Sequence, residues 1–195
     1  MTRGKGPTKI TSCRGKPPAA HARLEKATRA KVLIVMGSDS DFDHIAPAWQ
    51  VLDELGVAYE VRVASAHRTP EHAIDLATRA RERGFGVIIA GAGGAAHLAG
   101  VLAAHTTLPV VATPVAVGTL GGMDALLSAV QMPSGVPIAS VGIGGAQNAA
   151  LFATAILAAH DSLLAKRLLR FRRARADKVA AADERVRSKL ARSSR

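Results

Sequence analysis

A histidine and an arginine stand side by side at His67 and Arg68, just after the run YEVRVA (59–64). An imidazole titrates near neutral pH and can carry a proton, while the forked guanidinium suits a phosphate or a carboxylate. If both residues lie in a turn, they could serve one ligand as proton carrier and anion anchor. The alternative for Arg68 is a surface ion pair with Asp41 or Glu71.

The loop GSDSD (37–41) is a second candidate for ligand binding. It leads directly into an expected helix, so its backbone N–H groups and hydroxyls could hold an anion, although Ser40 or Asp41 could equally be a helix cap. Its alternating aspartates resemble the start of a calcium loop. His44 and Gln50 occupy the positions of the required glycine and glutamate, which excludes that site.

The glycine-rich segment GAGGAA (91–96) is a third candidate. It fits the loose dinucleotide pattern, but no acidic residue occurs between Glu82 and Asp124 to bind a ribose, and the chain has no Walker sequence. A dinucleotide site and ATP hydrolysis are therefore not expected. The segment predicts a loop whose backbone approaches a ligand closely.

The residue types absent from 32–160 exclude several kinds of catalysis. This stretch contains no lysine and no cysteine, which excludes a Schiff base and a thiol nucleophile there. Among the seven histidines, only His67 and His97 lie in or beside the loops that follow expected strands, and neither is in a metal-ligand pattern. His67 is thus the leading candidate for general acid and base.

The elements that must position these residues alternate along the chain. Five apolar runs predict strands, and segments with apolar residues at threes and fours predict helices between them. This order predicts an α/β fold, a three-layer α/β/α sandwich around a five-stranded parallel sheet, with the ligand site at the carboxyl ends of the strands. The expected strands are 32–36, 59–64, 86–91, 109–114 and 137–143, with 59–64 at an edge, and the expected helices are 41–55, 70–83, 95–106, 119–131 and 146–166.

Local signals set some of the expected helix ends. Thr69, Pro70 and Glu71 form a start signal, with the threonine hydroxyl as cap and proline at the first helical position. Gly56 and Gly84 are the expected stops of the first two helices. A basic helix is expected from about Leu163 to Leu190.

The charge of +11 is unevenly distributed along the 195 residues. Both ends are strongly basic, whereas 32–160 carries an excess of acidic residues, so the fold itself is not expected to bind nucleic acid. We expect a basic, disordered extension at 1–30, for which a transit peptide is the alternative, a catalytic domain at 31–172 and a basic tail at 173–195. The single cysteine, Cys13, excludes an intrachain disulfide, no membrane-spanning segment is expected, and a cytoplasmic location is the default.

Four motifs, in this order and spacing, resemble the PurE family: VMGSDSD (35–41), SAHRTP (65–70), GAGGAAHL (91–98) and DALLSAVQMPSGVP (124–137). The resemblance spans about residues 31–172. It implies a flavodoxin-like fold, a homo-octamer, and a mutase that moves a carboxyl group from nitrogen to carbon on a purine precursor, an aminoimidazole ribonucleotide. It also implies no cofactor, no metal, and a functional link to the ATP-dependent carboxyaminoimidazole ribonucleotide synthetase.

The resemblance also assigns roles to residues. His67 matches the catalytic histidine of the family, and Ser38, Asp41 and Arg68 match nucleotide-binding residues. Four further residues fall in the site motifs with less defined roles: Ser40, Ser65, Gly93 and His97. Ala99 and Ser134 depart from the common family pattern, which affects the expectation of loop rigidity and not the proton chemistry.

Three other functions stay open at this level. Direct carboxylation of aminoimidazole ribonucleotide with carbon dioxide is one, although family members with that activity tend to have lysine where this chain has Arg68. A flavin-binding electron carrier would share the fold but should offer aromatic residues beside the ligand, and the expected loops contain none. Nucleic-acid binding by the two basic ends would be an added function.

Overall fold

The computed structural model describes residues 30–193, so the expectations for the N-terminal extension, Cys13 included, lie outside the described residues. Strands and helices alternate along the described part of the chain. Their bounds are β1 (Lys31–Met36), η1 (Asp39–Asp41), α1 (Phe42–Leu55), β2 (Tyr59–Val63), α2 (Pro70–Thr78), β3 (Phe85–Gly93), α3 (Leu98–Ala104), β4 (Val110–Val115), α4 (Met123–Val130), β5 (Ala139–Ser140), α5 (Ala146–Ala158) and α6 (Ser162–Ser193).

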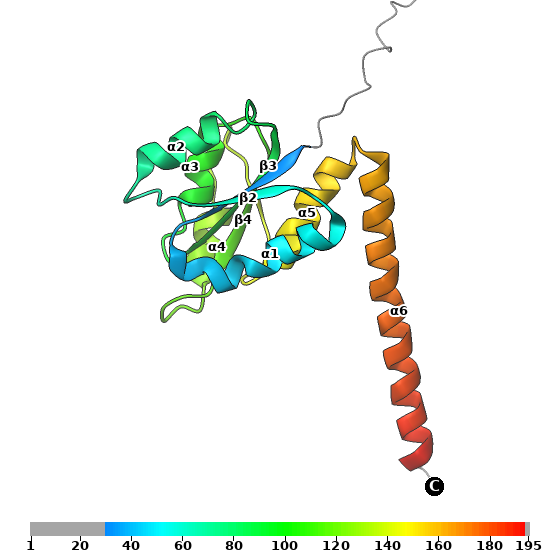
Figure 1. Ribbon diagram of the computed structural model, residues 1–195. Helices are drawn as coiled ribbons and strands as arrows, with labels where there is room; N and C mark the ends of the chain where they lie inside the picture. The colour runs from blue at the N-terminus through cyan, green and yellow to red at the C-terminus, as the bar shows by residue number, and fades with distance from the viewer. Residues whose placement is uncertain (1–29, 194–195) are drawn as a thin grey trace, which may run out of the picture.

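The five strands form one parallel sheet in the order β2-β1-β3-β4-β5. Helices α1 and α5 cover one face, and α2, α3 and α4 cover the other (Figure 1). The predicted α/β/α sandwich is confirmed, and β2 lies at an edge as its alternating sequence indicated. The order reverses between β1 and β3, where the crossovers leave in opposite directions and a ligand site is expected.

Each face of the sheet has its own apolar core, because successive strand residues point to opposite sides. In β1, Val32 and Ile34 pack toward α1 and α5, while Leu33 and Val35 pack toward α2 and α3. All four are fully buried. A continuous apolar strand is therefore required at this central position, and burial of its side chains holds the loops at the strand ends in place.

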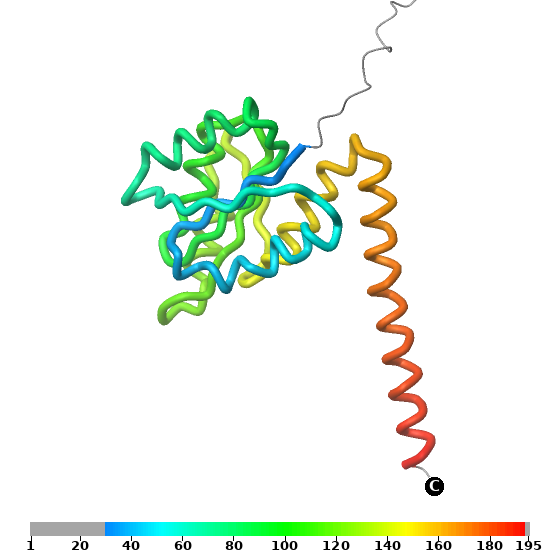
Figure 2. The backbone as a smooth tube through the Cα atoms, viewed as in Figure 1, coloured from blue at the N-terminus to red at the C-terminus, as the bar shows by residue number. Residues whose placement is uncertain are grey.

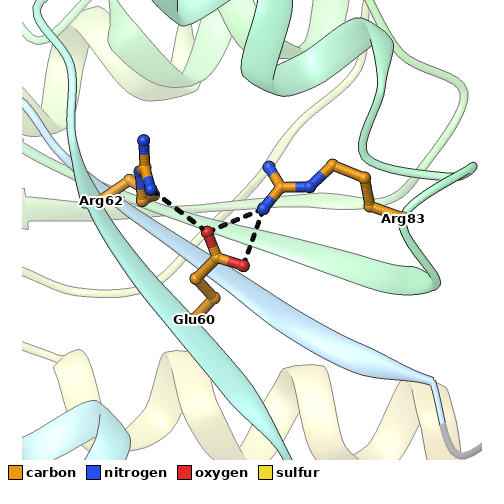
Figure 3. Close-up of polar contacts among 3 residues, drawn as sticks. All are labelled: Glu60, Arg62 and Arg83. Carbon is orange, nitrogen blue, oxygen red and sulfur yellow. Dashed lines mark hydrogen bonds and ion pairs between the residues drawn. The ribbon is translucent and has the colours of Figure 1, made fainter.

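Ion pairs hold the edge strand β2 in place near the amino-terminal ends of the strands. Glu60 accepts hydrogen bonds from Arg83 at 2.8 Å to each carboxylate oxygen, and Arg62 lies 3.6 Å away (Figure 3). Arg83 belongs to the turn before β3 and also lies over the ring of Phe85. These contacts join the turn before β3 to β2 across the start of β1, which lies between them.

Three of the expected boundaries were wrong. Helix α2 ends at Thr78 and not at 83, and a series of turns leads to Gly84, which has a φ of 81°. The last strand is only two residues long. The helix expected at 146–166 is two helices, because Asp161 accepts hydrogen bonds from the backbone N–H groups of Leu163 and Leu164 and starts a new helix there.

Helix α6 runs without a break from Ser162 to Ser193 and crosses the expected domain boundary at 172/173. Its first turns pack on α5 and α1, where Arg167 donates to the carbonyl oxygens of Leu55 and Gly56 at the end of α1. Its second half stands away from the body of the molecule (Figure 2). No helix within 30–193 combines the length and apolar character needed to span a membrane.

Candidate active site

A cleft of about 510 Å³ opens at the carboxyl ends of β1 and β3, at the point where the strand order reverses. Loops after β1, β2, β3 and β4 all contribute to it. The lining residues are Gly37, Ser38, Ser40, Asp41, Ser65, Ala66, His67, Arg68, Ala92, Gly93, Ala95, Leu98 and Val117.

The loop after β1 is a compact turn built from its own polar side chains. The Ser38 Oγ accepts a hydrogen bond from the backbone N–H of Ser40 at 3.4 Å, and Asp41 Oδ2 accepts one from the N–H of Ser38 at 3.1 Å. This reciprocal capping makes Ser38 the cap of η1, whereas Asp41, one of the two residues expected to cap the helix, occupies the N-cap position of α1 without a side-chain cap hydrogen bond. The turn presents two serine hydroxyls to the cleft.

Asp41 is only 5% exposed, although it lines the cleft. Burial raises the pKa of its carboxyl group above the ordinary value, and this effect exceeds the opposing effects of the Ser38 N–H, His44 and Arg68. The carboxylate is thus held in a poorly solvated position. A ligand hydroxyl that donates to it would replace part of the missing hydration.

The loop after β2 is held by Thr69, though not in the expected way. The Thr69 hydroxyl makes no cap hydrogen bond at the start of α2. Its Oγ1 instead accepts from the backbone N–H of Ser65 at 2.9 Å and donates to the carbonyl of Ser65 at 3.3 Å. The turn that carries His67 and Arg68 is therefore closed by threonine at its base.

Arg68 is directed across the cleft to the loop after β1. Its Nη2 donates to the carbonyl oxygen of Gly37 at 3.1 Å, and its Nε donates to Ser65 Oγ at 3.4 Å. Within the described chain, no ion pair joins Arg68 to Asp41 or Glu71, so the alternative reading of this residue was wrong. Its positive charge is held by neutral acceptors and remains available to an anion.

His67 and His97 meet across the cleft, a contact that the sequence did not predict. His67 Nε2 lies 2.9 Å from His97 Nδ1, with the two rings nearly perpendicular at 77°. Both side chains are exposed. His97 comes immediately before α3, on the loop after β3, so the contact joins the two loops on either side of β1.

The rest of the cleft is apolar and closely built. A Cβ atom at Gly93 would clash with the side chain of Val117, which belongs to the loop after β4, so only glycine fits there. Ala92, Ala95 and Leu98 extend this wall. Sequence reasoning missed Val117 because it is an isolated valine in a loop with no motif around it.

The structure brings the predicted site residues together in one place. Seven of them line the cleft, and the eighth, His97, contacts one of the seven through its ring. The loops after four strands thus supply hydrogen-bond donors, a pair of imidazoles and an apolar wall to the same cleft. Such a site can bind an anionic ligand and move a proton on it.

Comparisons with known proteins agree with this arrangement. A family model described as AIR carboxylase matches residues 31–178. The N5-carboxyaminoimidazole ribonucleotide mutase of Bacillus subtilis is 58% identical over 137 residues, covering 69% of this chain and 85% of the relative. The protein of that name from Mycobacterium tuberculosis is 53% identical over 167 residues, covering 84% and 96%. The crystal structure of Treponema denticola PurE superposes with a TM-score of 0.73 at 29% identity, covering 80% and 98%.

Proposed function

Because this chain belongs to the AIR carboxylase family, we propose that it is an N5-carboxyaminoimidazole ribonucleotide mutase in which His67 transfers the proton. The product is 4-carboxy-5-aminoimidazole ribonucleotide, an intermediate of purine biosynthesis. The observation that carries the proposal is the position of His67 and Arg68 side by side in the cleft at the strand-order reversal. The relatives named as mutases support this reaction.

The polar side of the cleft suits a ribonucleotide. The Arg68 guanidinium and the hydroxyls of Ser38, Ser40 and Ser65 can donate to phosphate oxygens, and the arginine supplies the charge. Asp41, an acceptor when ionised, suits a sugar hydroxyl. This assignment places the base of the nucleotide toward His67 and the apolar wall.

The reaction needs two proton transfers, one to the exocyclic nitrogen and one from C4. His67 donates a proton to the exocyclic nitrogen, the carbon–nitrogen bond of the carbamate breaks, and carbon dioxide is released beside the ring. The electron-rich C4 then attacks carbon dioxide, and the proton of C4 passes to the neutral His67, so the histidine ends in its starting form. No electrons are exchanged with another molecule, and the atoms of substrate and product balance.

The apolar wall has a role in this scheme. Carbon dioxide must remain beside C4 until the new bond forms, and water would protonate or hydrate the intermediates. Gly93 and Val117 contact closely, and Leu98, which also lines the cleft, is buried. A ligand seated against this wall would exclude water from the reacting atoms.

Direct carboxylation of aminoimidazole ribonucleotide is the alternative, and it is the reaction in the family description. To separate the two, purified enzyme is given either the carbamate or aminoimidazole ribonucleotide with bicarbonate, at low carbon dioxide. We expect rapid product formation from the carbamate only. Equal rates from both substrates would contradict the mutase.

The role of His67 has its own test. His67→Asn should abolish turnover while the nucleotide still binds with near-normal affinity, measured by calorimetry with the product. His72→Asn is a suitable control, because that histidine lies on α2 and does not line the cleft. A His67→Asn enzyme with a near-normal rate would disprove the assignment.

We also propose assembly into a homo-octamer in the cytoplasm, supplied with substrate by the ATP-dependent synthetase. Large apolar side chains are exposed on and before α4, including Leu120 at 64% and Leu127 at 51%. Such a patch is costly in water and suits burial against other copies. Sedimentation velocity would measure the assembly, and Leu127→Glu should weaken it.

A further inference from the structure

The residues on one side of α6 change from apolar to cationic along the helix. Leu164, Leu168 and Phe171 occupy its first turns at spacings of four and three residues, and they are buried in the core that α1 and α5 share. Residues at these spacings lie on one side of a helix. The apolar part of this side fixes α6 to the fold.

The same spacing continues beyond Phe171, but the residues become cationic. The series reads Arg175, Lys178, Ala182, Arg185, Lys189 and Arg192. We call its five charged members the basic stripe. All five are exposed, in the half of α6 that stands away from the body (Figures 1 and 2). The stripe is about 25 Å long, from 1.5 Å of rise per residue.

The stripe is not neutralised by its own helix. Among residues 30–193, the ion pairs within α6 join Arg187 to Asp183 and Glu184, each at 4.0 Å, and Arg187 is not part of the stripe. Arg175 lies 4.7 Å over the ring of Phe171, which fixes the first charge of the stripe where the apolar part ends. A row of cations that winds slowly around the helix is therefore presented to solvent.

We propose that the basic stripe binds the phosphate backbone of double-stranded nucleic acid, as a function separate from the catalytic cleft. A duplex carries regularly spaced negative charge along its length, and a rigid row of arginines and lysines can neutralise several phosphates at once. A helix is also of the right width for the major groove. Residues 172–193 contain no aromatic side chain, so the base stacking that single strands require is not provided.

Two other anionic partners fit less well. A helix that lies on a membrane needs a wide apolar face with several aromatic or leucine anchors, whereas the large apolar residues exposed beside the stripe are Val179, Val186 and a single leucine, Leu190, with no aromatic side chain among residues 172–193. A second copy of the chain would need a matching row of carboxylates. On the described surface Glu60 and Asp75 are already paired with arginines and Asp53 accepts from Tyr59, while Asp43 and Glu54 lie on α1, Glu71 on α2 and Glu82 in the turns before β3.

The stripe can be tested on the full chain with a matched control. The stripe variant is R175Q/K178Q/R185Q/K189Q/R192Q. The control, K166Q/R170Q/R172Q/R173Q/R187Q, removes the same number of charges from other positions of the same helix. Glutamine is a good helix former, and helix content by circular dichroism together with catalytic turnover should be unchanged in both. Binding is measured by fluorescence anisotropy with a labelled DNA duplex of about 30 bp over about 50 to 300 mM NaCl.

We expect the stripe variant to bind about a hundredfold more weakly at low salt. Its plot of log affinity against log salt should be less steep by about 4.5 if all five contacts are lost, since each lost phosphate contact removes about 0.9 from the slope. The control variant should lose much less affinity for the duplex. Equal losses in the two variants, no binding by the unmodified chain at low salt, or tighter binding to phosphatidylserine vesicles than to the duplex would each overturn the proposal.

Discussion

Nε2 of His67 lies 2.9 Å from Nδ1 of His97, so the proposed proton carrier is hydrogen-bonded to a second imidazole. Only one of the two facing nitrogens can hold the proton at a time, because two N–H groups in this position would repel each other. The contact thus restricts both the tautomer and the orientation of His67. His97 is a positioning residue in this arrangement.

His97→Leu should lower kcat by about tenfold to a hundredfold and change KM little, because it removes the partner that orients His67 and leaves the anion-binding side intact. Steady-state kinetics on the carbamate would measure both constants. His97→Asn keeps a polar atom near the position of Nδ1 and should recover part of the rate. An unaltered kcat in the leucine variant would show that the contact has no role in turnover.

Arg68→Ala should weaken nucleotide binding by about tenfold to a hundredfold, the usual effect of losing a charged hydrogen bond to an anion. Arg68 is positioned for this by the carbonyl of Gly37, which leaves further guanidinium donors available. Calorimetry with the product nucleotide would give the dissociation constant. Arg79→Ala is the control, since Arg79 pairs with Asp75 outside the cleft. Equal affinities for Arg68→Ala and the unmodified protein would rule out the anchor.

Much of the fold could be predicted because its strands are short, apolar and separated by helical patterns. β1 and β4 were placed to within one residue, since a strand buried on both faces needs uninterrupted apolar side chains. Helix ends were predicted less well. The end of α2 depends on turns before Gly84, and the start of α6 depends on one side-chain cap by Asp161, neither of which has a periodic signal.

The candidate site was predictable in part for a related reason. Residues that directly follow parallel strands must lie at one edge of the sheet, so the loops after β1, β2 and β3 were expected to meet. Which side chains touch could not be deduced in this way. The His67–His97 contact joins loops 30 residues apart, and Val117 reaches the cleft because Gly93 lacks a side chain.

Asp41→Asn should change how stability depends on pH. Burial raises the pKa of Asp41 above 3.8 in the folded protein, so the folded state holds this proton more tightly than the unfolded state. As pH rises through the interval just above 3.8, the unmodified protein must ionise a buried group and loses stability relative to the asparagine variant. Urea unfolding from about pH 4 to pH 7 would measure the difference. This account is contradicted if the difference in unfolding free energy between the two proteins does not vary with pH, or if the unmodified protein gains stability relative to the asparagine variant as pH rises.

Thr113→Val should stabilise the fold. The Thr113 hydroxyl is buried within β4 and has no hydrogen-bond partner among the described residues. It lies on the same side of the strand as Val111 and Val115, which belong to the core shared with α1 and α5. A methyl group of nearly the same size removes the cost of burying an unpaired hydroxyl, so we expect the free energy of unfolding to rise by about 1 kcal/mol.

The matched control for this substitution is Thr154→Val. Thr154 is equally buried, but its Oγ1 donates to the carbonyl of Ala150 at 2.8 Å, so the same change removes a formed hydrogen bond and should lower stability by about 0.5 to 1 kcal/mol. Both variants are compared by urea unfolding at one protein concentration, because assembly contributes to apparent stability. If the two substitutions shift the midpoint in the same direction, valine packing and not hydrogen bonding decides the outcome, and the unpaired hydroxyl carries no cost.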